Sequence, residues 1–216
     1  MNQTSTAETT YLYLVRHGAT KANEQVPYIL QGCGIDLPLS SIGREQATAV
    51  GQFMSGLELN SIYSSPHKRA VETAEAVAER HGVDVSSIEH LSECDVGEWE
   101  GMDWDSIRRA HPDHYHNFME NPAENAYFGG ESYGDVLNRV QPAIDSLLRR
   151  HTGESIAVIA HNIVNRVYLA GLMGIALRKA KGIRQSNTGV NLIRYRDGET
   201  ELITLNAVFH LEERLR

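Results

Sequence analysis

The chain of 216 residues is 41 % hydrophobic and 22 % charged, which is the balance of a globular protein with room for one α/β domain. Its formal net charge of −8 argues against nucleic acid or an acidic membrane surface as a partner, because either would call for a basic patch. The two cysteines, Cys33 and Cys94, are too few for a disulfide scaffold and are not spaced as metal ligands, so we expect free thiols and a cytoplasmic location.

We expect neither a targeting segment nor a membrane span. Residues 1–10 are polar and lack the basic and apolar regions of a secretory signal, and no apolar run approaches the roughly 20 residues that cross a bilayer. No repeat or low-complexity linker divides the remainder. We therefore expect a flexible tail over residues 1–10 and a single domain over residues 11–216.

Predicted strands and helices alternate in the first half of the chain. The apolar run at residues 11–15 predicts a buried strand, and residues 61–63 predict a shorter one. Between them, Ser40 is suited to cap a helix that runs to Met54. Ser65-Pro66 then predicts the start of a second helix, because proline at the first helical position loses no backbone hydrogen bond.

The second half continues the alternation. Residues 132–151 carry apolar side chains at helical spacing, and Pro142 should bend that helix. A buried strand is predicted at residues 156–160, and two apolar runs within 190–205 flank Asp197-Gly198 as a hairpin would. We predict an α/β three-layer sandwich, with helices on both faces of a mainly parallel sheet that has one antiparallel strand near its C-terminal end.

Basic side chains follow the predicted strands. Arg16-His17-Gly18 comes directly after the first strand, at the carboxyl edge where open α/β sheets bind ligands. Arg69 falls in the first turn of a helix, where free N–H groups and the helix dipole attract anions, and His161 follows another strand. An imidazole can attack a phosphoryl group while a guanidinium forks onto its oxygens. The pattern predicts a cationic pocket within an acidic protein.

With these residues the sequence resembles the histidine phosphatase superfamily, the phosphoglycerate-mutase-like enzymes. The resemblance spans about residues 11–205 and keeps the family's order of motifs. The matching segments are Arg16-His17-Gly18 with Thr20 and Asn23; Gln31-Gly32 with Asp36, Pro38-Leu39 and Gly43; Ser65-Pro66 with Arg69-Ala70 and Thr73-Ala74; Leu91-Ser92-Glu93 with Gly97-Glu98-Trp99-Glu100-Gly101; and Gly129-Gly130-Glu131-Ser132.

The resemblance implies a role for each of five catalytic residues. His17 would be the nucleophile that becomes phosphorylated, and His161 would stabilise the transferred phosphoryl group. Arg16 and Arg69 would bind its oxygens. Glu93 would protonate the leaving oxygen and then deprotonate the attacking water.

The resemblance also implies a set of substrate contacts, which are Arg16, Asn23, Gln31, Gly32, Arg69, His161 and Asn162. Asn162 departs from the family pattern, because many members have glycine after the second histidine. An asparagine at this position can cap a helix that begins at Ile163, so the change is tolerable. Thr20 is expected to orient its loop without touching the chemistry.

The proposed chemistry sets opposite demands on His17 and Glu93. His17 must be neutral to have a lone pair, which neighbouring arginines favour, and a backbone carbonyl on the other ring nitrogen would fix its tautomer. Glu93 must be protonated to act as an acid, which calls for an apolar or anionic setting. Phosphoryl transfer needs mainly positioning and charge stabilisation, so neither a metal nor a cofactor is implied.

Three features stand outside the motifs. Residues 111–116 contain three histidines, but they lack the i, i+4 pairing of a helical metal site and Pro112 interrupts a helix, so we predict a solvated connecting segment. Trp99 and Trp104 are expected to pack in the core. Cys33 and Cys94 fall in loops at the pocket rim, where the sequence does not define a redox role.

The sequence therefore favours a metal-independent phosphomonoesterase that acts on a small phosphorylated metabolite. A phosphoglycerate mutase would use the same residues, but the segment between Glu93 and Gly129 is short and lacks the longer mutase insertion, which favours hydrolysis. A noncatalytic phospholigand-binding module would be expected to lack a catalytic residue, whereas all five are present. A transition-metal enzyme using residues 111–116 is the third alternative. The substrate is not specified, and a homodimer is compatible with the sequence.

Overall fold

The computed structural model describes residues 8–215. Most of the expected tail at residues 1–10 lies outside this range. Thr10 is already the first residue of a strand and is fully buried, so the strand begins one residue earlier than expected.

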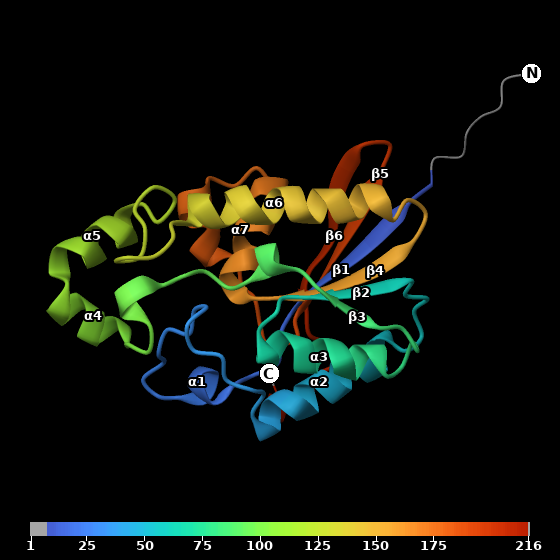
Figure 1. Ribbon diagram of the computed structural model, residues 1–216, viewed down its shortest axis with the longest axis horizontal. Coiled ribbons are helices and arrows are strands. Elements are labelled where there is room, and N and C mark those ends of the chain that lie inside the picture. Colours follow the sequence, from blue (N-terminus) through green and yellow to red (C-terminus); the bar gives the residue numbers. More distant parts are fainter. Residues whose placement is uncertain (1–7, 216) are drawn as a thin grey trace, which may run out of the picture.

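A single sheet of six strands forms the middle of the molecule (Figure 1). Its strands are β1 (Thr10–Arg16), β2 (Ser61–Ser64), β3 (Val85–Ser87), β4 (Ser155–Ala160), β5 (Val190–Arg196) and β6 (Glu199–Ala207). They lie in the order β3-β2-β4-β1-β5-β6, and β5 is the one strand of this sheet that runs opposite to the other five. Asp197 and Gly198 both have positive φ values, 56° and 84°, and form the tight turn between β5 and β6. The predicted fold class and hairpin are confirmed.

Helices cover both faces of the sheet (Figure 1). On one face lie α2 (Ser41–Met54) and α3 (Lys68–Ala78), and on the other lie α6 (Tyr133–Arg150) and α7 (Asn162–Leu172). Shorter elements fill the connections: α1 (Lys21–Glu24), η1 (Glu89–Leu91), η2 (Gly97–Trp99), α4 (Trp104–Ala110), α5 (Pro112–Glu120), η3 (Leu177–Gly182) and η4 (Glu213–Leu215). In Figure 1, α4 and α5 lie beyond one end of the sheet, beside the carboxyl ends of its parallel strands.

The side-chain alternation of the strands divides the core into two clusters. In β4, Ile156 and Val158 belong to the cluster under α6 and α7, whereas Ala157 and Ile159 belong to the cluster over α2 and α3. This two-sided burial explains why β4 is a continuous apolar run.

Three local predictions differ from the structure. Helix α3 begins at Lys68, two residues after Pro66, because Pro66 and His67 lie in the bend before it. Asn162 is the first residue of α7, so His161 occupies the N-cap position that the sequence predicts for Asn162. Residues 111–116 are largely helical rather than a connecting segment, because Pro112 starts α5 at a position where proline is tolerated.

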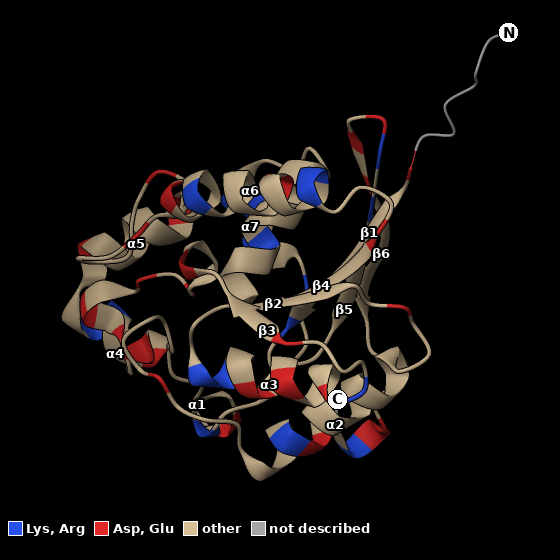
Figure 2. Cartoon of the chain, turned by 45° about the vertical axis from the view of Figure 1, so that its right-hand side comes forward, with Lys and Arg blue, Asp and Glu red and all other residues tan. Residues whose placement is uncertain are grey.

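Helix α6 begins with a reciprocal cap between Ser132 and Asp135 and continues through Pro142. Within residues 8–215 no helix combines the length and apolar character needed to cross a membrane. Acidic and basic residues are interspersed along α2, α4 and α6 in the view of Figure 2. The cytoplasmic location and the homodimer stay predictions.

Candidate active site

Three adjacent strands bring the predicted residues together. Strand β4 pairs in parallel with β1 on one side and with β2 on the other. Their carboxyl ends therefore open at the same edge of the sheet, where β1 leads to His17, β4 to His161 and β2 to Ser65. The rings of His17 and His161 lie 5.1 Å apart between centroids, in an edge-to-face arrangement.

His17 is buried, with 3 % of its surface exposed, and one ring nitrogen is fixed by its own loop. Its Nδ1 lies 2.6 Å from the carbonyl oxygen of Gly18, which can only accept a hydrogen bond. Nδ1 is therefore protonated and Nε2 carries the lone pair. Burial, followed by the charges of Arg69 and Arg16, holds the pKa of His17 well below 6.5, so the ring is neutral.

His161 is fully buried and is held through the opposite nitrogen. Its Nε2 lies 2.7 Å from the hydroxyl oxygen of Ser65, while its Nδ1 is buried without a hydrogen-bond partner. Burial, followed by the charge of Arg69, lowers the pKa of His161 well below its ordinary value. A neutral His161 that accepts from the Ser65 hydroxyl would carry its proton on Nδ1.

Arg16 and Arg69 contribute two cations that no carboxylate neutralises at salt-bridge distance within the described residues. Arg69 is 1 % exposed, and backbone carbonyls orient it: Nη2 donates to Gly32 at 2.9 Å and Nη1 to Ile35 at 3.2 Å. Nη1 of Arg16 donates to the carbonyl of Gln185 at 2.8 Å, and its Nε is buried without a partner. Buried guanidinium groups held in this way favour binding of an anion.

Glu93 lies at the same site, with 5 % of its surface exposed. Its Oε1 accepts from the N–H of Cys94 at 2.9 Å, and its Oε2 accepts from the N–H of Ile163 at 3.3 Å. The setting is polar and close to both arginines, which differs from the apolar or anionic setting that the sequence argument requires of a general acid.

Arg139 on α6 fixes the loop that carries Glu93. Its Nη1 donates to the carbonyls of His90 and Ser92 at 2.8 Å each, and its Nη2 donates to the carbonyl of Glu93 at 3.2 Å. The guanidinium also forms a two-pronged pair with Glu131, at 2.7 and 2.9 Å. One side chain on α6 therefore holds three backbone carbonyls of this loop, those of His90, Ser92 and Glu93.

Comparison with known proteins identifies the family. Residues 12–208 match the model of the histidine phosphatase superfamily (branch 1). The chain belongs to the histidine phosphatase superfamily.

Similar proteins agree with this membership and include phosphatases. Phosphoserine phosphatase 1 of Hydrogenobacter thermophilus is 31 % identical over 202 residues, which cover 94 % of each chain. The structure of Bacillus stearothermophilus YhfR is 33 % identical, with a TM-score of 0.86 over 94 % of this chain and 100 % of the other. The structure of Entamoeba histolytica phosphoserine phosphatase in complex with 3-phosphoglyceric acid is 27 % identical, with a TM-score of 0.83 over 94 % and 100 %. The chain is accordingly a phosphatase of this superfamily.

The other expected contacts of this histidine phosphatase lie around the five residues but are engaged within the protein. Both backbone groups of Gly32 are used, its N–H by Glu100 at 2.7 Å and its carbonyl by Arg69. Gln31 accepts from the hydroxyl of Thr20 at 2.7 Å, and Asn23 accepts from the backbone N–H of Thr20 at 3.1 Å. Direct substrate contact by these residues stays a prediction, whereas the loop role of Thr20 agrees with its capping box.

Asn162 is the exception among the expected contacts, because its Oδ1 is buried and has no partner within the protein. It lines a pocket next to His161 together with aromatic residues from α4, α5 and α6.

Sequence reasoning missed a third imidazole in this histidine phosphatase. The ring of His67 lies 5.1 Å from that of His161, and its Nε2 is buried without a partner. Burial, followed by the charge of Arg69, lowers the pKa of His67 to about 4. The sequence could have indicated His67 as a site residue, because it lies between Ser65-Pro66 and Arg69. This whole segment follows the end of β2 at the ligand-binding edge of the sheet.

The tryptophan and histidine side chains outside the site pack against neighbouring aromatic rings. Trp99 is fully buried and its ring contacts Trp104, Phe118 and Tyr127, in line with core packing. The rings of His111 and His114 lie against Phe128, with centroids 4.8 and 4.1 Å away. No group of three or more His, Cys, Asp or Glu residues within 8–215 is arranged to hold a metal ion.

Neither cysteine is set up as a reactive thiol. Burial raises the pKa of Cys33 to about 11 and raises that of the buried Cys94 well above its ordinary value. Because the thiolate is the reactive form, these shifts disfavour reaction at either residue.

Proposed function

We propose that the protein hydrolyses small phosphomonoesters through a phosphohistidine formed on His17. The main support is the pairing of a neutral, buried imidazole with two arginines that lack carboxylate partners among the described residues. The site has a nucleophile with a free Nε2 and, for the phosphoryl oxygens, two guanidinium groups without a carboxylate at salt-bridge distance among the described residues.

The first step transfers the phosphoryl group to the protein. Nε2 of His17 attacks phosphorus, the ester P–O bond breaks, and Glu93 gives its proton to the leaving oxygen. Arg16 and Arg69 hold the phosphoryl oxygens, and His161 donates to one of them from Nδ1.

The second step releases phosphate. A water molecule loses its proton to Glu93 and attacks phosphorus, and the P–N bond to His17 breaks. His17 is again neutral, and Glu93 is again protonated. The same residue therefore serves as acid in one step and as base in the next.

The phosphoserine phosphatases among the similar proteins make O-phosphoserine and 3-phosphoglycerate the first substrates to test. A phosphoglycerate mutase remains the second candidate, because it would use the same five residues and return the phosphoryl group to a substrate hydroxyl. Purified protein should release phosphate from at least one monoester of a panel faster than it interconverts phosphoglycerates. Interconversion of phosphoglycerates much faster than phosphate release from any monoester would favour the mutase instead.

A further inference from the structure

A network of buried side-chain amides lies beside the strand end that carries Arg16. Its members are Asn165 on α7, Gln185 in the loop before β5, and Asn191 on β5. Their exposed fractions are 0, 4 and 0 %. A buried amide costs free energy when it loses its hydrogen bonds, so a paired network of this kind strongly favours one arrangement of its side chains.

The backbone determines which way the amide of Asn191 points. Its Nδ2 donates to the carbonyl of Leu14 at 2.9 Å, and its Oδ1 accepts from the N–H of Asn206 at 2.9 Å. Because a carbonyl can only accept and an N–H can only donate, the two amide atoms of Asn191 cannot be exchanged. Leu14 lies opposite Asn191 in the pairing of β1 with β5, so this amide is tied to the strand that ends at Arg16.

Asn191 in turn fixes the side chain of Gln185, because the two amides exchange hydrogen bonds. Nε2 of Gln185 donates to Oδ1 of Asn191 at 3.0 Å, and Oε1 of Gln185 accepts from Nδ2 of Asn191 at 2.9 Å. Asn165 donates to the same Oε1 at 3.2 Å. Residues 183–186 form neither helix nor strand, so these side-chain bonds hold a backbone segment that no regular ladder of hydrogen bonds supports.

The backbone carbonyl of Gln185 is the acceptor for Nη1 of Arg16, at 2.8 Å. Arg69 has two carbonyl acceptors, those of Gly32 and Ile35, whereas Gln185 supplies the one acceptor of the Arg16 side chain within residues 8–215. A long, flexible side chain with a single anchor keeps its direction only if that anchor is itself fixed. The direction of Arg16 therefore depends on how firmly Gln185 is held.

We propose that Gln185, held by Asn165 and Asn191, is a positioning residue that directs the guanidinium of Arg16 at the phosphoryl group. The inference rests on the proposed function, in which Arg16 binds phosphoryl oxygens. With Nη1 bound to Gln185, the other donors of the guanidinium, including the unpartnered Nε, keep a fixed direction for an anion. The amide network acts on the reaction through Arg16.

Binding of inorganic phosphate tests the proposal without requiring turnover. Asn191→Leu removes the hydrogen bonds of this amide but keeps the branching of the side chain. Titration calorimetry should show that phosphate binds about 10- to 100-fold more weakly, the range for losing a hydrogen bond between charged groups. In an Arg16→Met background, Asn191→Leu should change the affinity by less than about twofold, because no guanidinium remains to be directed.

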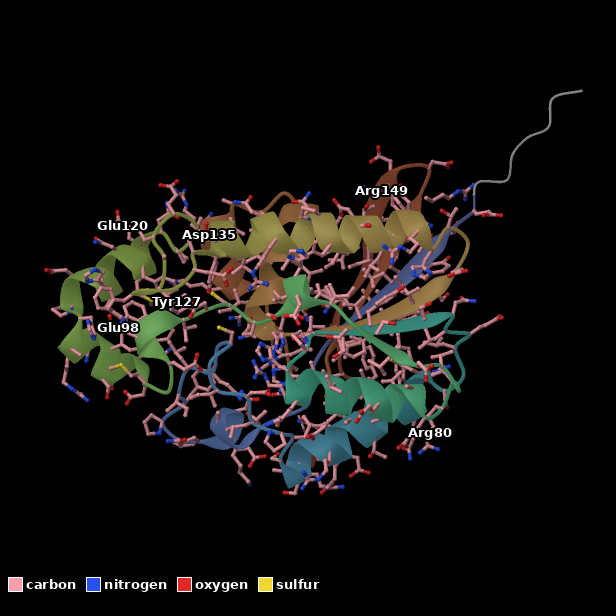
Figure 3. The ribbon with its side chains drawn as sticks, viewed as in Figure 1. Arg80, Glu98, Glu120, Tyr127, Asp135 and Arg149 are labelled. Carbon is pink, nitrogen blue, oxygen red and sulfur yellow. The ribbon has the colours of Figure 1, made fainter. Side chains whose placement is uncertain are left out.

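Thr10→Val is the matched control for the loss of a buried polar side chain. Thr10 is fully buried at the opposite end of β1, about 20 Å from Arg16 along an extended strand. Its hydroxyl donates to the carbonyl of His151 at 2.9 Å, at the end of α6 where Figure 3 labels Arg149. Urea unfolding should show that both variants lose stability, whereas phosphate affinity should fall in Asn191→Leu alone.

Asn165→Ala provides a milder variant if Asn191→Leu does not fold. It removes the 3.2 Å bond to Gln185 and leaves the exchange between Gln185 and Asn191 in place. Phosphate should bind about two- to fivefold more weakly, which corresponds to one ordinary hydrogen bond. This loss should also disappear in the Arg16→Met background.

Three results would overturn the proposal. Unchanged phosphate affinity in Asn191→Leu and Asn165→Ala would show that the network serves only the fold. Equal weakening with and without Arg16 would show that it acts on the site by another route. If the unmodified protein does not bind phosphate, Arg16 holds no phosphoryl group and the inference fails. The predicted dependence on Arg16 without hydrolysis of any monoester would reject the proposed hydrolysis while supporting the role of Gln185.

Discussion

At the scale of single residues, the two histidines of the site are held through opposite ring nitrogens. Gly18 accepts from Nδ1 of His17, whereas Ser65 lies against Nε2 of His161. The backbone N–H of His67 points to the same Ser65 oxygen at 3.4 Å, which leaves the Ser65 hydroxyl proton for His161. Ser65 is therefore a positioning residue that keeps the proton of His161 on Nδ1, where the phosphoryl group is proposed to bind.

Ser65→Ala should lower kcat about 10- to 100-fold, because removing one partner of a buried hydrogen bond costs about 1–3 kcal/mol. Nitrogen-15 NMR of the histidine rings should show that His161 loses its uniform Nδ1–H tautomer. Ser65→Thr keeps the hydroxyl and should restore both properties. An unchanged tautomer together with unchanged kcat in Ser65→Ala would refute this role.

At the scale of elements, α6 and α2 each hold a loop of the site in place. Arg139 on α6 grips the backbone before and at Glu93, and Glu131 completes the clamp by accepting from the N–H of Asp95 at 2.9 Å. Helix α2 approaches the loop after His17 so closely that a Cβ on Gly43 would lie 1.9 Å from the carbonyl oxygen of Ala19. Rigid elements thus position groups that the sequence places on loops.

Arg139→Met should misplace Glu93 and therefore slow reactions that depend on proton donation. Hydrolysis of an alkyl phosphate should fall at least about tenfold further than hydrolysis of 4-nitrophenyl phosphate, whose leaving group departs with little help from an acid. Steady-state kinetics on both substrates would measure the difference. Arg150→Met, at the exposed end of α6, is the matched control. Equal slowing of the two substrates would show that Arg139 supports only the fold.

The local sequence pattern predicts the strands and helices that carry the site, but it does not predict the residues at which the helices begin. The strand ends at His17 and His161 follow from apolar runs of the right length, and family motifs supply Glu93 and Arg69. The contact between Ser65 and His161, before the starts of α3 and α7, joins residues 96 positions apart. The clamp by Arg139 joins residues 46 to 49 positions apart, so neither periodicity nor capping rules could predict it.

At the scale of the whole molecule, burying neutral histidines makes stability depend on pH. The pKa values of His17, His161 and His67 are all lowered in the folded protein, chiefly by burial. The unfolded chain therefore binds more protons than the folded protein below pH 6.5. Stability should be fully present above that pH and should fall as the pH drops, by about 1.4 kcal/mol per pH unit for each proton.

His67→Leu should remove one of these protons. Because the pKa of His67 in the folded protein is about 4, its contribution to the slope should be present between about pH 6.5 and pH 4. Urea unfolding between pH 5 and 6 should give a slope smaller by about one proton than that of the unmodified protein. His116→Gln, an exposed change on α5, serves as the control variant. Identical slopes for His67→Leu and the unmodified protein would contradict the prediction.

The central claim is covalent catalysis by His17, and trapping of the intermediate tests it most directly. Rapid quenching after mixing with a phosphorus-32-labelled monoester should give a base-stable, acid-labile adduct, and peptide mapping should place it on His17. His17→Ala should give no adduct and should turn over at least about 10⁴-fold more slowly, as expected when a covalent nucleophile is removed. Near-normal turnover by His17→Ala, or an adduct on another residue, would contradict the account.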